Sequence, residues 1–169
     1  MDKQLTFFDF SSPKAAASWG PIDDRVMGGV SNSTFLYKDS SGALFAGEVS
    51  MEHGGGFASV RSGHLDLELS DYQGLAITCM GDGKSYKLSV TTEPRFDSVI
   101  YRTVFDTKPG IWEELKIPFG RFIPTFHGEI VSEAPELDPS HIVALGLLIS
   151  QRQKGSFRLK VSSIKTYCD

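Results

Sequence analysis

Two glycine-rich segments carry the side chains best suited to recognising a ligand or a partner. In the first, from Trp19 to Ser31, the residues Asp24, Arg25 and Met27 stand next to two glycines. Charged groups beside a backbone that can turn sharply suit a binding loop, and Met is an adaptable apolar contact. The same residues also suit a structural turn, in which Asp24 braces the loop, Arg25 pairs with it and Met27 plugs one end of the domain. Both interpretations stay open.

The second segment ends at Arg61 and contains three consecutive glycines followed by Phe57. Strand alternation places Phe57 and Arg61 on the same face. The planar guanidinium of an Arg can bind a carboxylate or stack on a ring, which suits a binding surface. The alternative is a structural Arg61, half-buried and paired with Asp24, Glu48 or Asp82. The sequence does not choose between these roles.

Tryptophans are the side chains that stack best on sugars, and the chain has two, Trp19 and Trp112. An exposed ring at either position would form a platform for a carbohydrate. Most tryptophans are largely buried, however, so both rings also suit the core. We keep Trp19 among the candidate binding residues, together with those of the two glycine-rich segments.

Catalytic patterns are weak in this chain. Acid–base hydrolysis needs two carboxylates on either side of a substrate, and Glu48, Glu52, Asp66, Glu68 and Glu93 are available. Solvated strand faces always offer such pairs, so ordinary surface positions explain them. No Gly-x-Ser-x-Gly elbow occurs, and the cysteines have no local signature that links them to a histidine. We therefore predict that the protein is not an enzyme.

Metal-binding patterns are equally weak. The four histidines are scattered without metal-ligand spacing. A calcium site would use Asp23, Asp24 and the acidic segment 133–138, but a solvated acidic loop has the same composition. Cys79 and Cys168 are too far apart for a Cys-x-x-Cys pattern, and Cys79 lies in an apolar run that predicts burial. We expect neither a metal site nor a cofactor.

Composition excludes several classes of partner. The chain has 169 residues, a net charge of −4 and a pI of about 5.6, so it lacks the basic excess of a nucleic-acid-binding protein. Its longest apolar run, 142–149, is too short to span a bilayer, although peripheral membrane association stays open. The first residues resemble neither a signal peptide nor a transit peptide, so we expect a cytoplasmic protein.

Alternation of apolar and polar residues dominates the chain and predicts an all-β fold. We expect about ten strands from eleven runs, some of which merge, near 4–10, 32–38, 42–51, 56–61, 63–70, 74–80, 85–92, 98–106, 111–117, 141–150 and 156–167. Residues 14–18 suggest a short helical turn, Asp82-Gly83 indicates a hairpin, and 120–140 reads as a long surface loop over one sheet edge. Residues 1–169 therefore form a single sandwich or barrel domain.

The order of the motifs resembles a known family. Asp24-Arg-Val-Met-Gly-Gly-Val-Ser31 and Gly54-Gly-Gly-Phe-Ala-Ser-Val-Arg61, followed by Ile117-Pro-Phe119 and Gly155-Ser-Phe157, are similar to the complex I intermediate-associated protein 30 family. This resemblance implies a jelly-roll β-sandwich of the galactose-binding-domain-like type. Mitochondrial members are assembly factors of respiratory complex I, and photosynthetic relatives assist photosystem biogenesis. Without a transit sequence or a second domain, this chain is expected to be a single-domain, bacterial member.

The resemblance implies a function as a non-enzymatic assembly factor or chaperone-like binding module. Its partners would be protein subunits or assembly intermediates of a respiratory or photosynthetic membrane complex. A carbohydrate-binding module on the same jelly-roll fold is the alternative, and a hydrolase on that scaffold is a third hypothesis. Because sandwiches host unrelated functions, the fold alone does not choose among them.

Overall fold

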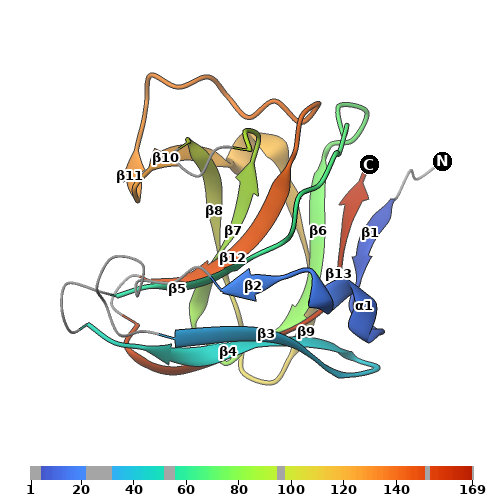
Figure 1. Ribbon diagram of the computed structural model, residues 1–169, viewed down its shortest axis with the longest axis vertical. Coiled ribbons are helices and arrows are strands. Elements are labelled where there is room, and N and C mark those ends of the chain that lie inside the picture. Colours follow the sequence, from blue (N-terminus) through green and yellow to red (C-terminus); the bar gives the residue numbers. More distant parts are fainter. Residues whose placement is uncertain (1–4, 22–31, 52–55, 95–97, 151–152, 169) are drawn as a thin grey trace.

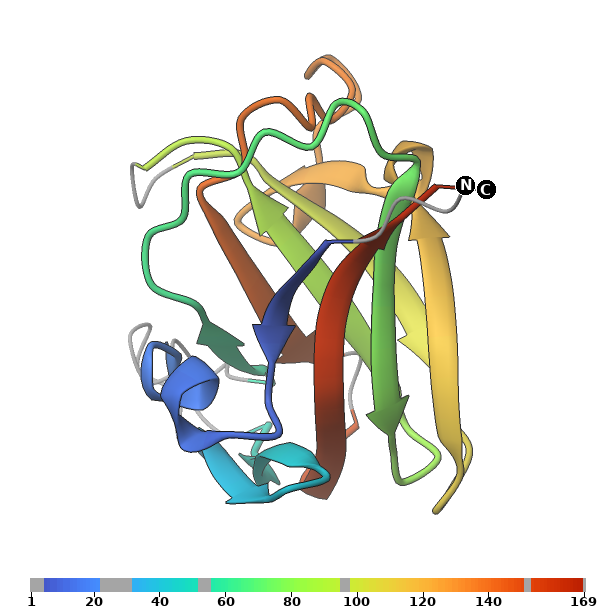
Figure 2. The ribbon, with the colours of Figure 1, turned by 90° about the vertical axis from the view of Figure 1, so that its right-hand side faces the viewer.

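Two antiparallel sheets pack face to face in this protein (Figures 1 and 2). The computed structural model describes residues 5–21, 32–51, 56–94, 98–150 and 153–168. Nearly all regular structure in these residues is β, apart from a short helix, α1 (Pro13–Ala17), and a 3-10 turn at Phe119–Arg121. The prediction of an all-β jelly-roll sandwich is confirmed.

Sheet A has the strand order β3-β4-β13-β6-β9, and β1 also pairs with β13. Its longest strand, β13, crosses the whole sheet and pairs first with β4 and then with β6 and β1. The bounds are β1 (Thr6–Asp9), β3 (Asn32–Asp39), β4 (Gly42–Val49), β6 (Gly74–Met80), β9 (Trp112–Pro118) and β13 (Gly155–Tyr167).

Sheet B has the strand order β11-β10-β8-β7-β12-β5-β2. In Figure 1, β10 and β11 lie at the upper left of the molecule and β5 at the lower left, while β6 and β13 of sheet A lie on the right. The bounds are β2 (Gly20–Pro21), β5 (Ala58–Arg61), β7 (Ser85–Thr91), β8 (Ile100–Asp106), β10 (Ile123–Phe126), β11 (Glu129–Ile130) and β12 (Ala144–Ile149).

The core lies between the inner faces of the two sheets. Phe45 of β4 and Leu159 of β13 project from sheet A, while Leu88 of β7 and Leu147 of β12 project from sheet B, and each of these is fully buried. Such burial is the main stabilising contribution of a sandwich. Among the described residues no helix is long and apolar enough to cross a bilayer.

The turn at Asp82-Gly83 is tight, as predicted, but it does not close a hairpin. Gly83 has a φ of +94°, which a glycine adopts without strain. The strands on either side of it, β6 and β7, belong to different sheets and do not pair. The prediction of a hairpin is therefore wrong, because turn residues specify a change of direction and not the partner of the next strand.

The segment 63–70 also differs from its prediction. Its alternating leucines do turn toward the interior, and Leu69 is buried. The backbone N–H groups of Leu65, Leu67 and Leu69 donate to carbonyls of residues 139–143, but only one isolated bridge forms, between Leu67 and Ile142. The alternation correctly indicates the buried side of the segment and wrongly predicts a regular strand, because it contains no information on register with a neighbour.

The predicted surface loop at 120–140 is partly wrong. It contains β10 and β11, which form a short hairpin at one edge of sheet B. Three prolines and weak periodicity hide these strands in the sequence. Pro124 lies within β10, where it pairs with Tyr101 of β8. Pro124 has no N–H to donate, and its carbonyl accepts a hydrogen bond of 3.0 Å from Val131 N–H just beyond the two-residue ladder of β10 with β11.

Candidate binding face on sheet B

A cross-strand row on the outer face of sheet B carries two arginines. Arg61 of β5 pairs with Gly146 of β12, Gly146 pairs with Ser89 of β7, and Ser89 pairs with Arg102 of β8. Directly paired residues lie on the same face of an antiparallel sheet. The next row along consists of the buried Val60, Leu147 and Leu88, so the arginine row faces outward.

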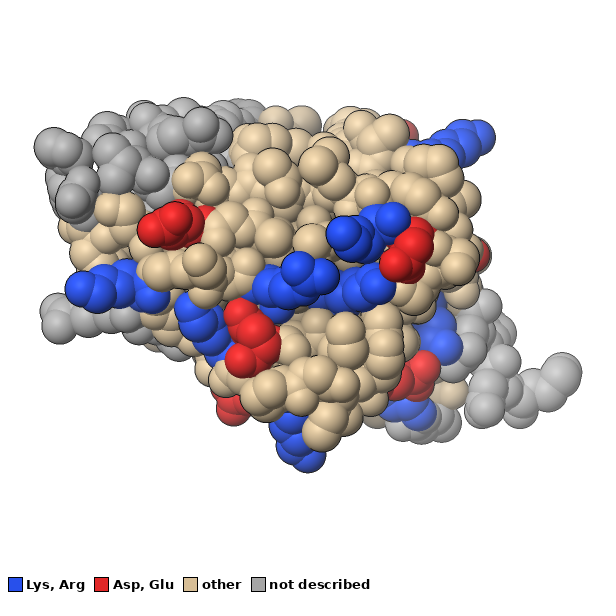
Figure 3. All heavy atoms as spheres, turned by 90° about the horizontal axis from the view of Figure 1, so that it is seen from below, with Lys and Arg blue, Asp and Glu red and all other residues tan. Residues whose placement is uncertain are grey.

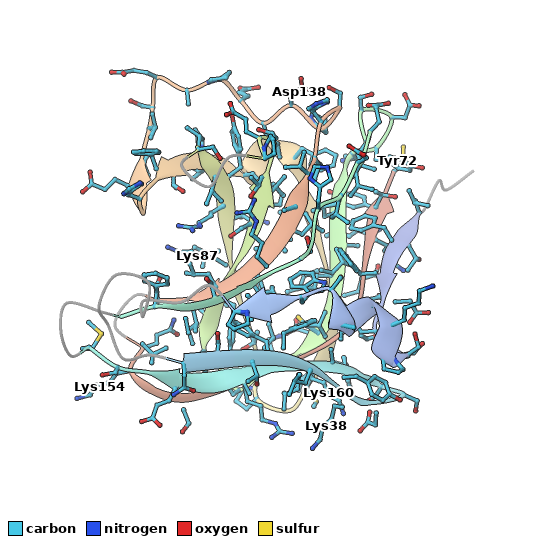
Figure 4. The ribbon with its side chains drawn as sticks, in the orientation of Figure 1. Lys38, Tyr72, Lys87, Asp138, Lys154 and Lys160 are labelled. Carbon is cyan, nitrogen blue, oxygen red and sulfur yellow. The ribbon has the colours of Figure 1, made fainter. Side chains whose placement is uncertain are left out.

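A third cation, Lys87, lies on the same face. It is two residues from Ser89 along β7, and Figure 4 shows its side chain on the side of sheet B turned away from sheet A. The side chain of Arg102 leans toward the middle of this face, since its Nε donates a hydrogen bond of 3.4 Å to Ser89 Oγ. Burial, and secondarily the nearby charge of Arg102, lowers the pKa of Lys87. Arg61, Lys87 and Arg102 are called the cation cluster below.

The surroundings of the cation cluster are unusually buried for an outer face. Ser89 and Leu148 expose only 8% and 5% of their surfaces, and Gly146 is buried. The cations themselves are half-buried, and burial lowers the pKa of the guanidiniums of Arg61 and Arg102. Both arginines remain charged at neutral pH. These charges have therefore lost part of their hydration.

Within the described residues no carboxylate forms an ion pair with the cation cluster. The described salt bridges join His64 to Asp66, Lys160 to Asp39 and Lys165 to Glu114. On the outer face of sheet B the strands carry one carboxylate, Asp106, which accepts a hydrogen bond of 2.5 Å from Ser85 Oγ. The cations thus have the charge and the position to receive an anionic group from outside.

The structural pairings proposed for Arg61 are wrong for Glu48 and Asp82. Glu48 lies on β4 in sheet A, where it pairs across the ladder with Asn32 and Ser156. Asp82 accepts hydrogen bonds of 2.9 Å from the Tyr86 hydroxyl and from the backbone N–H of Arg158. The third partner, Asp24, lies outside the described residues.

Trp19 is part of the core and presents no platform. It is 6% exposed, and its ring lies 4.7 Å from that of Phe35, 5.2 Å from that of Phe8 and 5.8 Å from that of Phe10. Its indole Nε1 has no hydrogen-bond acceptor among the described residues. Trp112 is the exposed tryptophan, at 41%, on the outer face of sheet A.

The remaining candidate residues are only partly placed. Phe57 lies directly before β5 and is half-buried. Asp24, Arg25 and Met27 lie outside the described residues, as do Asp23 and Glu52. The structure therefore brings together Arg61, from the original candidate set, with Lys87 and Arg102, which were not in it.

Alternation along β7 and β8 is consistent with Lys87 and Arg102 on the polar faces of these strands. What the sequence lacked was the order of the strands in sheet B. Arg61 is 26 residues from Lys87 and 41 from Arg102 in the numbering, and only the placement of β12 between β5 and β7 brings them together. No local motif contains this information.

A shallow pocket of about 270 Å³, separate from the cation cluster, is lined by two carboxylates and a histidine, namely Asp66, Glu68 and His141. Hydrogen bonds from the side chain and backbone of Ser70 lower the pKa of Glu68. A general acid needs a raised pKa, so Glu68 is poorly suited to that role. Among the described residues no group of three or more His, Cys, Asp or Glu could hold a metal ion.

The cysteines form no redox pair in the described chain. Both are free, and burial raises the pKa of Cys79 to about 12. A thiol of this kind is inert, because the thiolate is the reactive form. The prediction that Cys79 packs as a small buried residue is confirmed, at 1% exposure.

Comparison with protein families gives a match over nearly the whole chain. The family model of complex I intermediate-associated protein 30 matches residues 8–161. The chain belongs to this family. The match includes both glycine-rich segments and every strand of sheet B, so the cation cluster lies within the family domain.

Two curated family members illustrate the relationship. The mitochondrial complex I intermediate-associated protein 30 of Drosophila melanogaster is 25% identical and covers 93% of this chain. Its Mus musculus counterpart is 23% identical and covers 100% of the chain. This chain spans 60% and 58% of the lengths of these two relatives.

Solved structures show where the fold recurs. The family 11 carbohydrate-binding module of the cellulase Lic26A-Cel5E of Clostridium thermocellum superposes with a TM-score of 0.72. The alignment covers 97% of this chain and 94% of that module, with 14% sequence identity. At this identity the likeness establishes the jelly-roll fold and leaves the ligand open.

Proposed function

We propose that this chain is a non-enzymatic binding protein that holds subunits or assembly intermediates of a respiratory or photosynthetic membrane complex. The observation that carries the proposal is the family match over residues 8–161, because the family is named for its association with complex I intermediates. The two curated relatives above have the same name.

The chemistry of the described residues supports binding over catalysis. The carboxylates of the shallow pocket are exposed, and Glu68 has a lowered pKa. Burial raises the pKa of Cys79, which opposes nucleophilic chemistry. The cation cluster, by contrast, has charged groups that are partly desolvated and available to an anion.

Carbohydrate binding is the second candidate, because the fold recurs in carbohydrate-binding modules. The outer face of sheet B gives it little support. None of the outward-facing residues within the described strands of this sheet is aromatic, and sugars bind best to a ring they can stack on. A glycan array that includes mixed-linked β-glucans tests this candidate directly.

The assembly function is tested in the native cell. A chromosomally tagged chain is isolated under mild detergent, and co-purified proteins are quantified against a tag-only strain. In parallel, membrane complexes of a deletion strain are separated on native gels. We expect enrichment of subunits of one membrane complex, and accumulation of its subassemblies when the gene is deleted.

The proposal is wrong if no membrane-complex subunit is enriched and the deletion strain assembles all its complexes normally. A matched variant separates specific capture from charge effects. Arg61→Met with Arg102→Met should lose the partner, whereas Arg158→Met with Lys160→Met, which removes the same charge from sheet A, should retain it. Loss in both variants would indicate non-specific attraction and contradict a role for sheet B.

A further inference from the structure

We propose that the outer face of sheet B binds an acidic, extended segment of a partner protein, with Arg61, Lys87 and Arg102 as the residues that receive its carboxylates. This inference deepens the proposed function, on which it rests in one respect, namely that the partner is a protein. It names the chemistry of the partner and the residues that recognise it.

The geometry of the face supports an elongated ligand. Arg61 and Arg102 lie in one row, with Gly146 and Ser89 between them. Three strand spacings separate their backbones, on the order of 14 Å. In an extended peptide, side chains four residues apart point the same way and lie about 13 Å apart. A segment that crosses the strands can therefore place one carboxylate near each arginine.

The two residues between the arginines in this row, Gly146 and Ser89, are small, and they are called the floor of sheet B below. Gly146 has no side chain, and a Cβ built there would lie 2.9 Å from the carbonyl oxygen of Val60 and 3.6 Å from the Cβ of Ser89. Ser89 is short and holds the side chain of Arg102 through its hydroxyl. Gly146 and Ser89 are themselves buried, so the ligand contacts the half-buried cations at both ends of the row and not the residues between them.

The electrostatics favour an anion. Three cations face outward from the described strands of sheet B against one carboxylate, Asp106, although the chain as a whole has a net charge of −4. Half-buried charges of one sign that lack counter-ions are unfavourable in the free protein. A carboxylate that forms a bidentate bond with an arginine removes this penalty and gains directional hydrogen bonds.

The apolar margin of the face favours a peptide over a small anion or a sugar. Val104 of β8, which pairs with Lys87, is 39% exposed, and Ile123 of β10, which pairs with Arg102, is 46% exposed. Aliphatic side chains next to cations suit a segment that mixes acidic and aliphatic residues. An acidic oligosaccharide would leave this apolar surface without a contact.

The experiment is an NMR titration of the ¹⁵N-labelled full chain with two synthetic peptides. The acidic peptide has Glu at every second position, with Ala and Leu between, and the control has Gln in place of each Glu. We expect saturable shifts of the amides of residues 59–61, 87–89, 102–104 and 146–148, and of the Nε–H groups of Arg61 and Arg102. The Gln peptide should bind at least about tenfold more weakly.

Two double variants of equal net charge test the site. Arg61→Met with Arg102→Met should weaken the acidic peptide by at least about tenfold, and Arg158→Met with Lys160→Met by less than about twofold. The amide spectrum of each variant shows whether it folds. Arg61→Lys keeps the charge without the planar fork, so it should restore part of the affinity relative to Arg61→Met.

The inference is overturned by an absence of saturable shifts with the acidic peptide, by shifts centred on another face, or by equal losses in both double variants. Oligogalacturonate is titrated as a separate arm, and binding of this sugar without binding of the peptide would also overturn it. If the peptide fails while the isolation from cells still recovers a membrane complex, the proposed function stands and this inference falls. If the peptide binds and the isolation from cells recovers no membrane complex, this inference stands and the proposed function falls.

Discussion

The outer faces of the two sheets both carry lysine and arginine, yet they hold these charges differently. On sheet A, Lys160 Nζ lies 3.3 Å from Asp39 Oδ2, and Lys165 Nζ lies 3.0 Å from Glu114 Oε2. Seen from below, the molecule has basic and acidic side chains interspersed (Figure 3). On sheet B, Lys87 and its neighbouring arginines have no carboxylate partner among the described residues.

Burial does not explain the contrast. The side chain of Lys160 is only 15% exposed, so it is largely buried, and yet it has a carboxylate partner, Asp39. Figure 4 shows Lys160 at the lower side of the molecule near β3 and β4, far from Lys87 on sheet B. Two cations of sheet A thus have carboxylate partners within the chain, whereas the cations of sheet B have none among the described residues.

The largest expected effect on stability comes from filling the floor of sheet B. Gly146→Val should lower the free energy of unfolding by about 1–3 kcal/mol, because its Cβ would meet the carbonyl oxygen of Val60 at 2.9 Å. Ala46→Val, at a central position on the outer face of sheet A, should change it by about 0.5 kcal/mol or less. Urea unfolding measures the change in both variants. Equal changes would contradict the prediction that position 146 has less room for a side chain than position 46.

Removing a cation should have opposite effects on the two sheets. Lys87→Met should raise the free energy of unfolding by about 0.5 kcal/mol, since a half-buried charge without a partner disappears and solvent screening keeps the gain small. Lys160→Met should lower it slightly, because Asp39 loses its partner.

The gain from Lys87→Met should also depend on pH. Because the folded-state pKa of Lys87 lies below its unfolded value, the half-buried charge destabilises the wild-type chain fully at neutral pH. This destabilisation disappears as the pH rises toward about 10. Thermal unfolding of both proteins at neutral and alkaline pH checks this. A difference between them that stays constant with pH would contradict the assignment.

The smallest effect is expected at Asp39 on sheet A. Hydrogen bonds from Ser41, and to a lesser degree the charge of Lys160, lower its pKa to about 2. A carboxylate with a depressed folded-state pKa stabilises above its unfolded pKa, and this contribution is lost as the pH falls. Asp39→Asn should therefore weaken the pH dependence of the unfolding midpoint between about pH 4 and pH 2.

Ser41→Ala is the matched control for Asp39, because it removes the main cause of the shift and leaves the carboxylate in place. It should reproduce most of the effect of Asp39→Asn, whereas Lys160→Met should reproduce little of it. An effect dominated by Lys160 would mean that the ion pair, and not the local turn, holds the Asp39 carboxylate ionised.

Much of the fold follows from alternation alone. Because successive side chains of a strand point to opposite faces, the pattern of 85–92 correctly places Tyr86, Leu88 and Val90 in the core and Lys87 outside. The same argument places Arg61 outward. The order of the motifs, in turn, was enough to predict the family that the comparison with protein families confirms.

Other features required the tertiary structure. The two tryptophans have similar sequence signals, yet Trp19 is buried among phenylalanines and Trp112 is exposed on sheet A. The turn at Asp82-Gly83 has the residues of a hairpin and still connects two sheets. In both cases the outcome depends on which distant segments pack against the local one.

The sequence by itself thus determined the pleat: which residues alternate, which face each one takes, and hence the all-β class. The tertiary structure decided which strands lie next to one another. The cation cluster of Arg61, Lys87 and Arg102 forms only because β12 lies between β5 and β7, and Gly146 of β12 pairs with a residue on each of them. The periodicity of a strand is a local property of its backbone, whereas strand order results from hydrogen bonding and burial between segments that are distant in the chain.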